Sequence, residues 1–491
     1  MFPHTEATAL MNTNEGLLVK ARAQFERLLG WLEAAADDRQ RLDQVERGLL
    51  RELLALGLTL LQAFVARLGT GDVGPTLERD SNCWRRLPEP RRRRYVSIFG
   101  ELELRRHGYG TREGQKIQAV PLDEALGLPA SDFSYVVQDW SQRLCVKGSF
   151  AEAAAELQQL LGLTTSVASL ETLNRQVSDA ADGFRQQQAP PAVADGALLV
   201  VSGDGKGVPM CAADQPEPTP AADDGVPRGK KRMAYVGAVY SVAPFVRTAD
   251  DVLDEYRRRQ RAADRPAPQG KRVWAEMTQV VAGETCDGRT TLFGEMADDV
   301  ARRDPTGAAP RVAVMDDEAA LWAAMRLFFG DACVGVLDLI HVLGYLWLAA
   351  HVFHPTGSAA AQAFVDERLR QLLEGRVGRV VGGLRQMLAK HALTGAKRRT
   401  LQTVITYLAN NQAHMRYDVY LAAGYPIASG VIEGACRHVV QDRLEQTGMR
   451  WTRRGAQAML HLRALYLNGD WDAFLEHRIQ TEQQALYGIA I

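Results

Sequence analysis

Residues 311–330 read RVAVMDDEAALWAAMRLFFG, and this stretch decides the expected fold. It begins with a short apolar run, and from Ala319 onward apolar side chains recur at helical spacing. Residues 332–353, ACVGVLDLIHVLGYLWLAAHVF, repeat the same order of strand and helix. Residues 197–207, ALLVVSGDGKG, add another apolar run that ends in a turn. Strands and helices that alternate in this way predict an α/β core.

The N-terminal part of the chain has a different pattern. Apolar residues at three- and four-residue spacing over residues 14–68 predict helices, which the glycine-rich stretch 69–75 ends. Residues 91–106 alternate around the turn FGE and are rich in arginine, which predicts a basic β-hairpin. Helices are expected from there to about residue 188. Two of them, within 149–184, resemble a helix-turn-helix in length and spacing, although an ordinary antiparallel helix pair is the commoner explanation of such a pattern.

The rest of the chain divides by composition. The polar stretch 212–232 predicts a loop, and RTTLFG, residues 289–294, predicts a strand. Residues 358–426 predict only helices. We therefore expect five parts: an N-terminal helical arm (1–75), a DNA-binding region with the basic hairpin (76–190), the first part of the core (191–357), a helical insertion (358–426) and a completion of the core with C-terminal helices (427–491).

The bulk composition is that of a globular protein. The 491 residues are 46% hydrophobic and 24% charged. No stretch approaches the roughly 18 consecutive apolar residues that span a bilayer, and the N-terminus lacks a signal-peptide pattern. We therefore expect a soluble, cytoplasmic protein. The formal net charge is −1, but residues 84–116 are strongly basic, which suits a protein that contacts a polyanion at chosen places.

Three carboxylates stand beside these predicted elements. Asp204 follows the apolar run in VVSGDGKG, and Asp316 ends the run in VAVMDDEA. Glu433 lies between small residues in SGVIEGAC. Each has an ordinary structural explanation. Asp-Gly favours a hairpin turn, an aspartate before a helix caps it, and a glutamate early in a helix suits the helix dipole.

Taken together, the three acids predict a metal site. Acids that follow neighbouring strands lie at one edge of a sheet, where open α/β folds place their sites, and a helix packed there would add Glu433. Hard cations such as Mg²⁺ prefer oxygen ligands. Two such ions about 3.5–4 Å apart hold the attacking and leaving oxygens of an in-line phosphoryl transfer. We therefore expect Mg²⁺ or Mn²⁺ as cofactor, two ions per site, held by Asp204, Asp316 and Glu433.

The motifs around these acids resemble a known family. SGDGKG, VMDDEAALW, DLIHVLGYLWLAAHVFHPTGS and YPIASGVIEGACRHVVQDRLEQTGMRW are similar to motifs of DDE transposases of bacterial insertion sequences, most closely the ISKra group. The resemblance covers nearly the whole chain. It implies a ribonuclease-H-like catalytic core with an all-helical insertion before the final glutamate. It implies Asp204, Asp316 and Glu433 as the three catalytic acids, and a D-x-x-H motif of related families falls on Asp338 and His341.

Two features depart from the family pattern. The family usually has glycine after the second aspartate, whereas this chain has Asp317. We prefer Asp316, the last residue of the predicted strand, as the ligand, and Asp317 is the alternative. Many relatives carry two CxxC pairs around the N-terminal hairpin, but here only Cys83 lies near that place. Because the six cysteines form no CxxC pair, we expect no structural zinc.

The resemblance implies a transposase that binds the ends of its insertion sequence and cleaves and joins DNA strands. A catalytically inactive or repurposed DNA-binding protein is one alternative, and a ribonuclease-H-like nuclease or resolvase is another. The expected partners are double-stranded DNA, as transposon ends and target, and further copies of the chain in a homodimer or higher oligomer; no membrane is expected. Trp451 is a candidate platform for an unpaired base. The candidate DNA-binding residues are Arg91, Arg92, Arg93, Arg94, Arg105, Arg106, Lys206, Arg437, His438, Arg443, Arg450 and Trp451.

Overall fold

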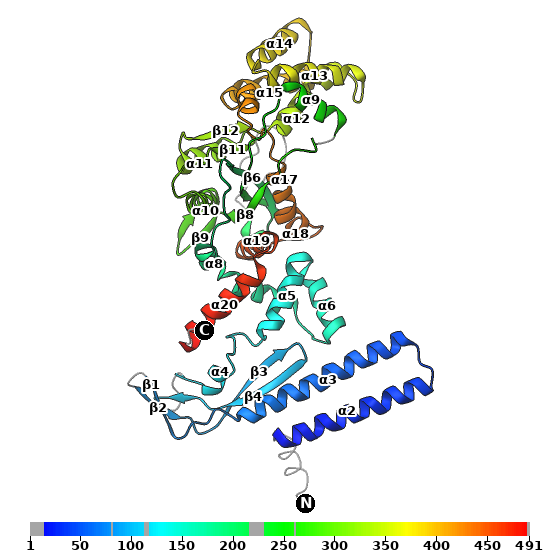
Figure 1. Ribbon diagram of the computed structural model, residues 1–491, viewed down its shortest axis with the longest axis vertical. Coiled ribbons are helices and arrows are strands. Elements are labelled where there is room, and N and C mark those ends of the chain that lie inside the picture. Colours follow the sequence, from blue (N-terminus) through cyan, green and yellow to red (C-terminus); the bar gives the residue numbers. More distant parts are fainter. Residues whose placement is uncertain (1–13, 80–81, 112–116, 216–229, 260–261, 489–491) are drawn as a thin grey trace, which may run out of the picture. The chain divides into compact units, whose positions relative to one another are not determined.

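The chain forms two compact units, and each is described by itself. The computed structural model describes residues 14–79, 82–111, 117–215, 230–259 and 262–488 (Figure 1). Most of the predicted loop 212–232 lies outside these residues. Unit 1 comprises Met1–Ala180 with Asp472–Ile491, and unit 2 comprises Ala181–Trp471. The last helix therefore groups with the N-terminal residues, whereas the sequence analysis assigned all of 427–491 to the core.

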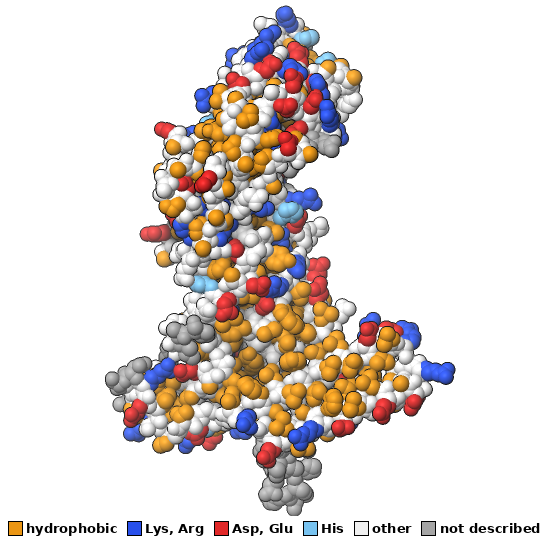
Figure 2. Space-filling view, viewed as in Figure 1, with side chains coloured by type: hydrophobic (Ala, Val, Ile, Leu, Met, Phe, Trp, Pro, Cys, Tyr) orange, Lys and Arg blue, Asp and Glu red, His pale blue; other side chains and the backbone are white. Residues whose placement is uncertain are grey.

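Unit 1 begins with the two predicted helices, which are confirmed as α2 (Asn14–Asp37) and α3 (Leu42–Leu68) (Figure 1). The helices pack along each other, and the Trp31 ring occupies the space beside Gly48, where a Cβ would lie 2.5 Å from it. Hydrophobic side chains nevertheless gather on their exposed surface, among them Phe64, which is 57% exposed (Figure 2). The pairing of α2 and α3 thus leaves part of their apolar surface uncovered.

The apolar character of α3 corrects the expectation that no stretch of the chain is long and apolar enough to span a bilayer. Among the described residues, α3 alone is long and apolar enough to cross a membrane, with a mean hydropathy of 1.7 over its most apolar window. Only 11% of that window is buried. The sequence analysis required an uninterrupted apolar run. Arg51 and Glu52 interrupt the apolar residues of α3, so that criterion excluded this helix. The finding concerns length and composition alone and assigns no membrane to the protein.

The predicted basic hairpin is confirmed. Strands β3 (Arg91–Ser97) and β4 (Gly100–Arg106) pair antiparallel around a two-residue turn. A small sheet, which the sequence analysis missed, precedes and follows it. The remaining elements of unit 1 are β1 (Thr76–Arg79), β2 (Asn82–Arg86), β5 (Tyr109–Gly110), α4 (Pro121–Ala125), α5 (Tyr135–Lys147), α6 (Phe150–Leu161), α7 (Val167–Ser178) and α20 (Trp471–Tyr487), whose first residue closes unit 2.

Unit 2 is built on a mixed sheet, so the predicted α/β core is confirmed. Its strand order is β12-β11-β6-β7-β8. The two short strands run parallel to β6, and the long strands β7 and β8 continue the sheet antiparallel. Apolar residues of these strands are almost wholly buried under the helices, as a parallel ladder requires. The strands are β6 (Leu198–Pro209), β7 (Lys231–Val242), β8 (Gln269–Met277), β11 (Arg311–Met315) and β12 (Cys333–Leu337).

The strand predicted over 289–294 is wrong, because these residues lie in helix α10 (Gly288–Arg303). The side chain of Asp287 caps this helix by accepting a hydrogen bond from the backbone N–H of Thr290, at 3.1 Å. Leu292, Phe293 and Met296 are buried on one side of it. This helical spacing outweighs the β-branched residues of RTTLFG.

The remaining helices of unit 2 cover the sheet and form the late helical region. That region, predicted over 358–426, is confirmed as α13 to α16. The elements are α8 (Ala181–Gln187), η1 (Ala212–Asp214), α9 (Ala249–Arg258), β9 (Gln279–Val281), β10 (Glu284–Cys286), α11 (Ala319–Phe329), α12 (Leu339–Phe353), α13 (Ala359–Leu373), α14 (Val377–Lys390), α15 (Gly395–Asn410), η2 (Gln412–His414), α16 (Tyr417–Ala422), α17 (Gly430–Ala435), the π-helical η3 (Cys436–Gln441), α18 (Asp442–Leu444) and α19 (Arg453–Asn468).

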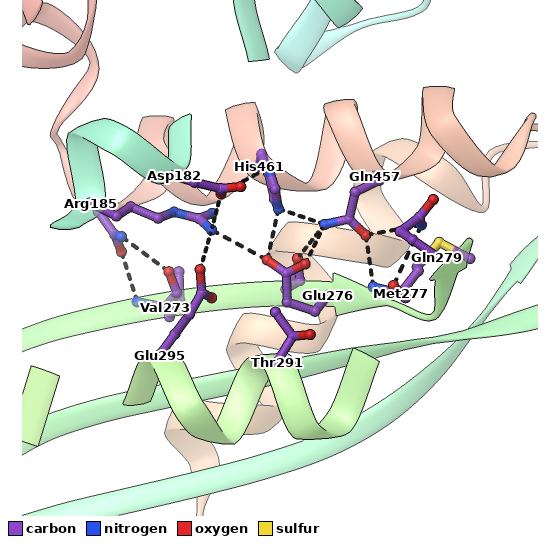
Figure 3. Close-up of polar contacts among 12 residues, drawn as sticks. Asp182, Arg185, Val273, Glu276, Met277, Gln279, Thr291, Glu295, Gln457 and His461 are labelled. Atoms are coloured by element: carbon purple, nitrogen blue, oxygen red, sulfur yellow. Dashed lines mark hydrogen bonds and ion pairs between the residues drawn. The ribbon is translucent and has the colours of Figure 1, made fainter. Parts of the chain in front are cut away.

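A buried polar network fastens α8, α10 and α19 to strand β8 (Figure 3). Glu276 of β8 lies at its centre and contacts His461 Nε2 at 2.7 Å and Arg185 Nη1 at 3.3 Å. Gln457 donates to the second oxygen of Glu276 at 2.7 Å, and Arg185 also reaches Glu295 at 3.2 Å. We call these five residues the buried network. Each of its glutamates faces a cationic or hydrogen-bonding partner.

Candidate metal centre

Asp204 lies within strand β6, not at a turn, which corrects the expectation that the strand ends there. β6 runs on to Pro209 because β7 pairs with it along its whole length. Its parallel pairing with β11 ends at Val201, so Asp204 lies just beyond the parallel ladder. Its Oδ1 accepts from the backbone N–H of Gly205 at 2.7 Å, and its Oδ2 accepts from the Cys436 thiol at 3.2 Å.

Asp316 directly follows β11, the strand that pairs with β6. Its Oδ1 accepts from the backbone N–H of Glu318 at 3.1 Å, and Trp322 Nε1 donates to its carbonyl at 2.6 Å. Burial raises the pKa of Asp316, and the negative charge of Asp204 raises it further. The charge of Asp204, which is far away in the sequence, therefore acts on Asp316.

Asp317 faces a different part of the molecule. Its side chain is exposed, and it lines a cavity beside α15 with Tyr345 and Tyr407. Burial raises the pKa of both tyrosines, and the charge of Asp317 adds to that rise. Asp204 is thus among the charges that act on Asp316, whereas Asp317 lines the cavity beside α15.

Glu433 comes from helix α17 and joins the same group. Its side chain is 43% exposed. Burial raises its pKa, Asp338 and Asp204 raise it further, and His341 opposes them. The three acids that the sequence analysis selected thus share one electrostatic environment.

Asp338 and His341 lie beside Glu433, and they make the tightest group. Asp338 caps α12, is 2% exposed, and accepts from the backbone N–H of Ile340 at 2.8 Å and from Ser429 Oγ at 2.9 Å. His341 Nε2 lies 3.9 Å from Glu433 Oε1. Among the described residues, Asp338, His341 and Glu433 are the group whose ligand atoms all lie within 4.8 Å of one another.

The sequence analysis missed Glu318, a further acid of this group. Its Oε2 lies against β6, where a Cβ on Gly205 would approach it to 3.3 Å. Burial raises its pKa, and Asp316 and Asp204 raise it further, while Arg289 opposes them. Its place two residues after Asp316 in MDDEA was a usable signal, since a backbone turn there brings both side chains to one edge.

The chemistry of this set suits a divalent cation. We call Asp204, Asp316, Glu318, Asp338 and Glu433, with His341, the carboxylate cluster. Like charges that raise one another's pKa lower their repulsion when they share a cation. Carboxylate oxygens with one imidazole fit Mg²⁺ or Mn²⁺ better than a soft metal.

The arginines of the β3–β4 hairpin divide into two groups. Arg91, Arg92, Arg94 and Arg105 are exposed. The side chain of Arg93 is only 10% exposed, and both Arg93 and Arg106 pair with the buried carboxylate of Asp123. Arg93 and Arg106 therefore stabilise the packing of unit 1, whereas the four exposed arginines do not have that role.

On the exposed face of the hairpin, acids offset some of the positive charge. Arg92 pairs with Glu103 at 3.4 Å, and Arg94 with Glu101 at 2.7 Å. Exposed ion pairs of this kind are weak, so a phosphate group can displace them.

Two of the candidate DNA contacts in the C-terminal segment are buried. Arg443 is 0% exposed and lies over the Trp451 ring, at 4.9 Å from its centroid. Trp451 is 6% exposed and donates through Nε1 to the Leu444 carbonyl at 3.1 Å. Neither side chain is accessible to DNA, so the expectation that Arg443 and Trp451 contact DNA is wrong. The arginines around Trp451 in GMRWTRR suggested an exposed basic surface. Instead, the Trp451 ring packs inward, and the Arg443 guanidinium packs over it.

The other C-terminal candidates are accessible. Arg437 is 70% exposed, and His438, 56% exposed, pairs with Asp442 at 2.8 Å. Arg450 is exposed, and Lys206 is half-buried on β6, two residues beyond Asp204 and therefore on the same face of the strand.

Comparison with known proteins adds no relative. No protein-family model matches the sequence, and a search of curated proteins finds no similar protein.

Proposed function

We propose that the chain is a DNA transposase of the DDE type, with a ribonuclease-H-like core in unit 2. The observation that carries the proposal is electrostatic: the charge of Asp204 in β6 acts on Asp316 at the end of β11 and on Glu433 in α17. Glu433 also belongs to the close group with Asp338 and His341, which does not include Asp204 or Asp316. Burial and the charge of Asp204 raise the pKa of Asp316 and of Glu433, so ionisation of either acid is disfavoured where it stands. A resident pair of Mg²⁺ or Mn²⁺ ions accounts for that arrangement.

In the proposed reaction, a water or a 3′-hydroxyl oxygen attacks a DNA phosphorus, and the opposite P–O bond breaks. The bound cations would supply charge stabilisation at the attacking and leaving oxygens. Asp204, Asp316 and Glu433 would hold them. His341, whose Nε2 lies 3.9 Å from Glu433 Oε1, would orient the attacking water or a phosphate oxygen. Asp338 positions the start of α12, and so His341, through its hydrogen bonds to Ile340 and Ser429.

DNA binding is assigned to exposed basic side chains. Arg91, Arg92, Arg94 and Arg105 of the hairpin suit the transposon end, since phosphate contacts position a protein on DNA without reading its sequence. Lys206 and Arg437 lie near the carboxylate cluster in the chain and suit the strand that reacts. A second copy of the chain on the paired ends is part of this proposal.

A cleavage and joining assay tests the proposal. The full chain is incubated with DNA that carries the sequences flanking its own gene, with Mg²⁺ or Mn²⁺ and with chelator. We expect metal-dependent cleavage at the element ends and joining to a target. Asp204→Asn, Asp316→Asn and Glu433→Gln should each abolish both steps yet leave end binding intact, and Asp317→Asn serves as the matched control.

The alternatives predict different products. Metal-dependent cleavage without joining would favour a nuclease or resolvase. End binding without cleavage in any metal would favour a repurposed DNA-binding protein and overturn the enzyme proposal.

A further inference from the structure

A cavity of about 690 Å³ lies beside the carboxylate cluster in unit 2. Helices α12 and α17, which carry His341 and Glu433, supply part of its wall through Ile340 and Gly434. A Cβ on Gly434 would meet nothing within 4 Å, which confirms open space at that point. The volume is within the usual range for a small-ligand site, roughly 300–1,000 Å³.

The wall of this cavity carries an excess of positive charge. Arg247 and Arg265 share one carboxylate, Glu255, at 4.0 and 3.6 Å. Lys271 also lines the cavity, and no carboxylate of the described chain pairs with it. Glu255 is the carboxylate paired with both arginines, and Asp251 also acts on Arg247, yet neither acid lines the cavity with the three cations. A wall of this kind favours an anionic ligand.

Arg247 is the strongest single sign of a missing partner. It is 7% exposed, and its Nε is buried without a hydrogen-bond partner. A buried guanidinium with an unsatisfied N–H is costly. Burial lowers its pKa to about 10, and the neighbouring charge of Arg265 contributes to that fall. An anion in the cavity would satisfy this arginine.

The same wall offers aromatic surface. Tyr240, Phe245 and Tyr425 line the cavity together with the cationic side chains. Rings bind flat aromatic groups, and nucleobases stack on them. Tyr240 also links the cavity to the carboxylate cluster. Burial raises its pKa, Asp338 raises it further, and Arg265 opposes this rise, so the ring lies within electrostatic range of both sites.

We propose that this cavity binds a nucleoside phosphate, with the phosphate on Arg247, Arg265 and Lys271 and the base against the aromatic wall. Resting on the proposed function, we assign the ligand to an unstacked nucleotide of the DNA strand held at the carboxylate cluster. A free nucleotide has the same chemistry, and the experiment separates the two sources.

Binding is measured on the full chain in chelator, so that no cleavage occurs. The probes are a fluorescent single-stranded oligonucleotide, a deoxynucleoside monophosphate, the corresponding deoxynucleoside and inorganic phosphate. Arg265→Gln and Lys271→Gln remove charge from side chains that are not fully buried, and Gly434→Leu fills the cavity without a change of charge. Arg379→Gln, on an exposed arginine of α14, is the matched control. Arg247 is left intact because its burial links it to folding.

We expect Arg265→Gln and Lys271→Gln each to weaken oligonucleotide binding about tenfold or more, as loss of a charged hydrogen bond does. Gly434→Leu should weaken binding because its side chain occupies the cavity, and the control should bind normally. Preference for the oligonucleotide over the monophosphate supports the strand as the source, and equal binding supports a free nucleotide. Inorganic phosphate that binds as well as the monophosphate, or variants that bind like the control, would overturn the proposal. If the cavity variants both cleave and bind DNA like wild type, this inference is wrong and the proposed function stands. If the wild-type chain binds the probes but cleaves no DNA, the transposase proposal is wrong and this inference stands.

Discussion

Unit 2 holds two groups of acidic side chains that differ in what faces them. In the buried network, Glu276 contacts His461 and Arg185 within 3.3 Å. In the carboxylate cluster, Asp204 accepts hydrogen bonds from a thiol and a backbone N–H, and Asp316 from a backbone N–H. The first group neutralises its own charge. The neutral donors of the second group compensate its charge only in part.

The pKa directions follow this difference. Charges of His461 and Arg185 outweigh the effect of burial and lower the pKa of Glu276. Burial and neighbouring acids instead raise the pKa of Asp316 and of Glu433. Acids that are paired inside the protein serve its stability, whereas acids that repel one another at a sheet edge indicate a cation site.

The largest expected effect comes from breaking the buried network. Arg185→Met removes the cation between Glu276 and Glu295, so Glu295 loses this partner and Glu276 keeps only His461 and Gln457. We expect a loss of about 3–5 kcal/mol in the free energy of unfolding, the usual result of removing one partner of a buried ion pair. Urea denaturation of the full chain measures it, with Arg379→Met as the control. A loss below about 1 kcal/mol, the value typical of exposed pairs, would show that the network contributes little.

The opposite change in the carboxylate cluster tests the other half of the comparison. Asp316→Asn removes a repelled charge, so without metal we expect stability to stay the same or rise slightly. Wild type should gain stability on addition of Mg²⁺ or Mn²⁺, by about 2.7 kcal/mol at a metal concentration 100 times the Kd. Asp316→Asn should lose that gain. Thermal denaturation with and without metal decides it, and an undiminished gain in the variant would contradict the assignment.

A smaller effect separates neighbouring acids. Asp317 faces α15, and Glu318 faces β6 beside Asp316. Asp317→Asn should therefore keep the full metal-dependent stabilisation, whereas Glu318→Gln should reduce it in part. The same thermal measurement applies. Equal losses in the two variants would show that the second acid was chosen wrongly.

Much of the fold was predictable because its periodic patterns are long. The two long helices, the basic hairpin and the strand-to-helix order around Asp316 and Asp338 follow from local apolar spacing. The full length of β6 was not, since pairing with β7 carries the strand past the Asp-Gly dipeptide, which by itself favours a turn. Tertiary pairing overrode a local signal.

The candidate site shows the same limit. Asp204, Asp316 and Glu433 were selected from the sequence, but the burial of Arg443 and Trp451 was not foreseen, because a basic run does not reveal which side chains turn inward. The proximity of Glu318 and Cys436 to the site results from contacts between segments far apart in the sequence, such as the hydrogen bond from the Cys436 thiol to Asp204. The cationic cavity around Arg247 joins segments far apart in sequence, so no motif announces it.

A pH dependence of stability is expected from the buried network, through Glu295 and His461. Burial raises the pKa of Glu295 to about 7, with Arg185 opposing and Glu276 adding to the rise. Burial disfavours protonation of His461, but Glu276 outweighs it and raises that pKa also. Both groups thus bind protons more tightly in the folded chain than in the unfolded one.

The sign of the pH effect follows from that difference. Stability falls with rising pH wherever the folded state holds more protons. The unfolded values are about 4.3 for glutamate and about 6.5 for histidine, so the fall should begin near pH 5 for Glu295 and continue above pH 6.5 for His461. Glu295→Gln should flatten the lower part of this slope, in unfolding measured from pH 5 to 8. Glu367→Gln, at an exposed glutamate of α13, should leave the slope as in wild type, and a Glu295 variant with the wild-type slope would refute the assignment.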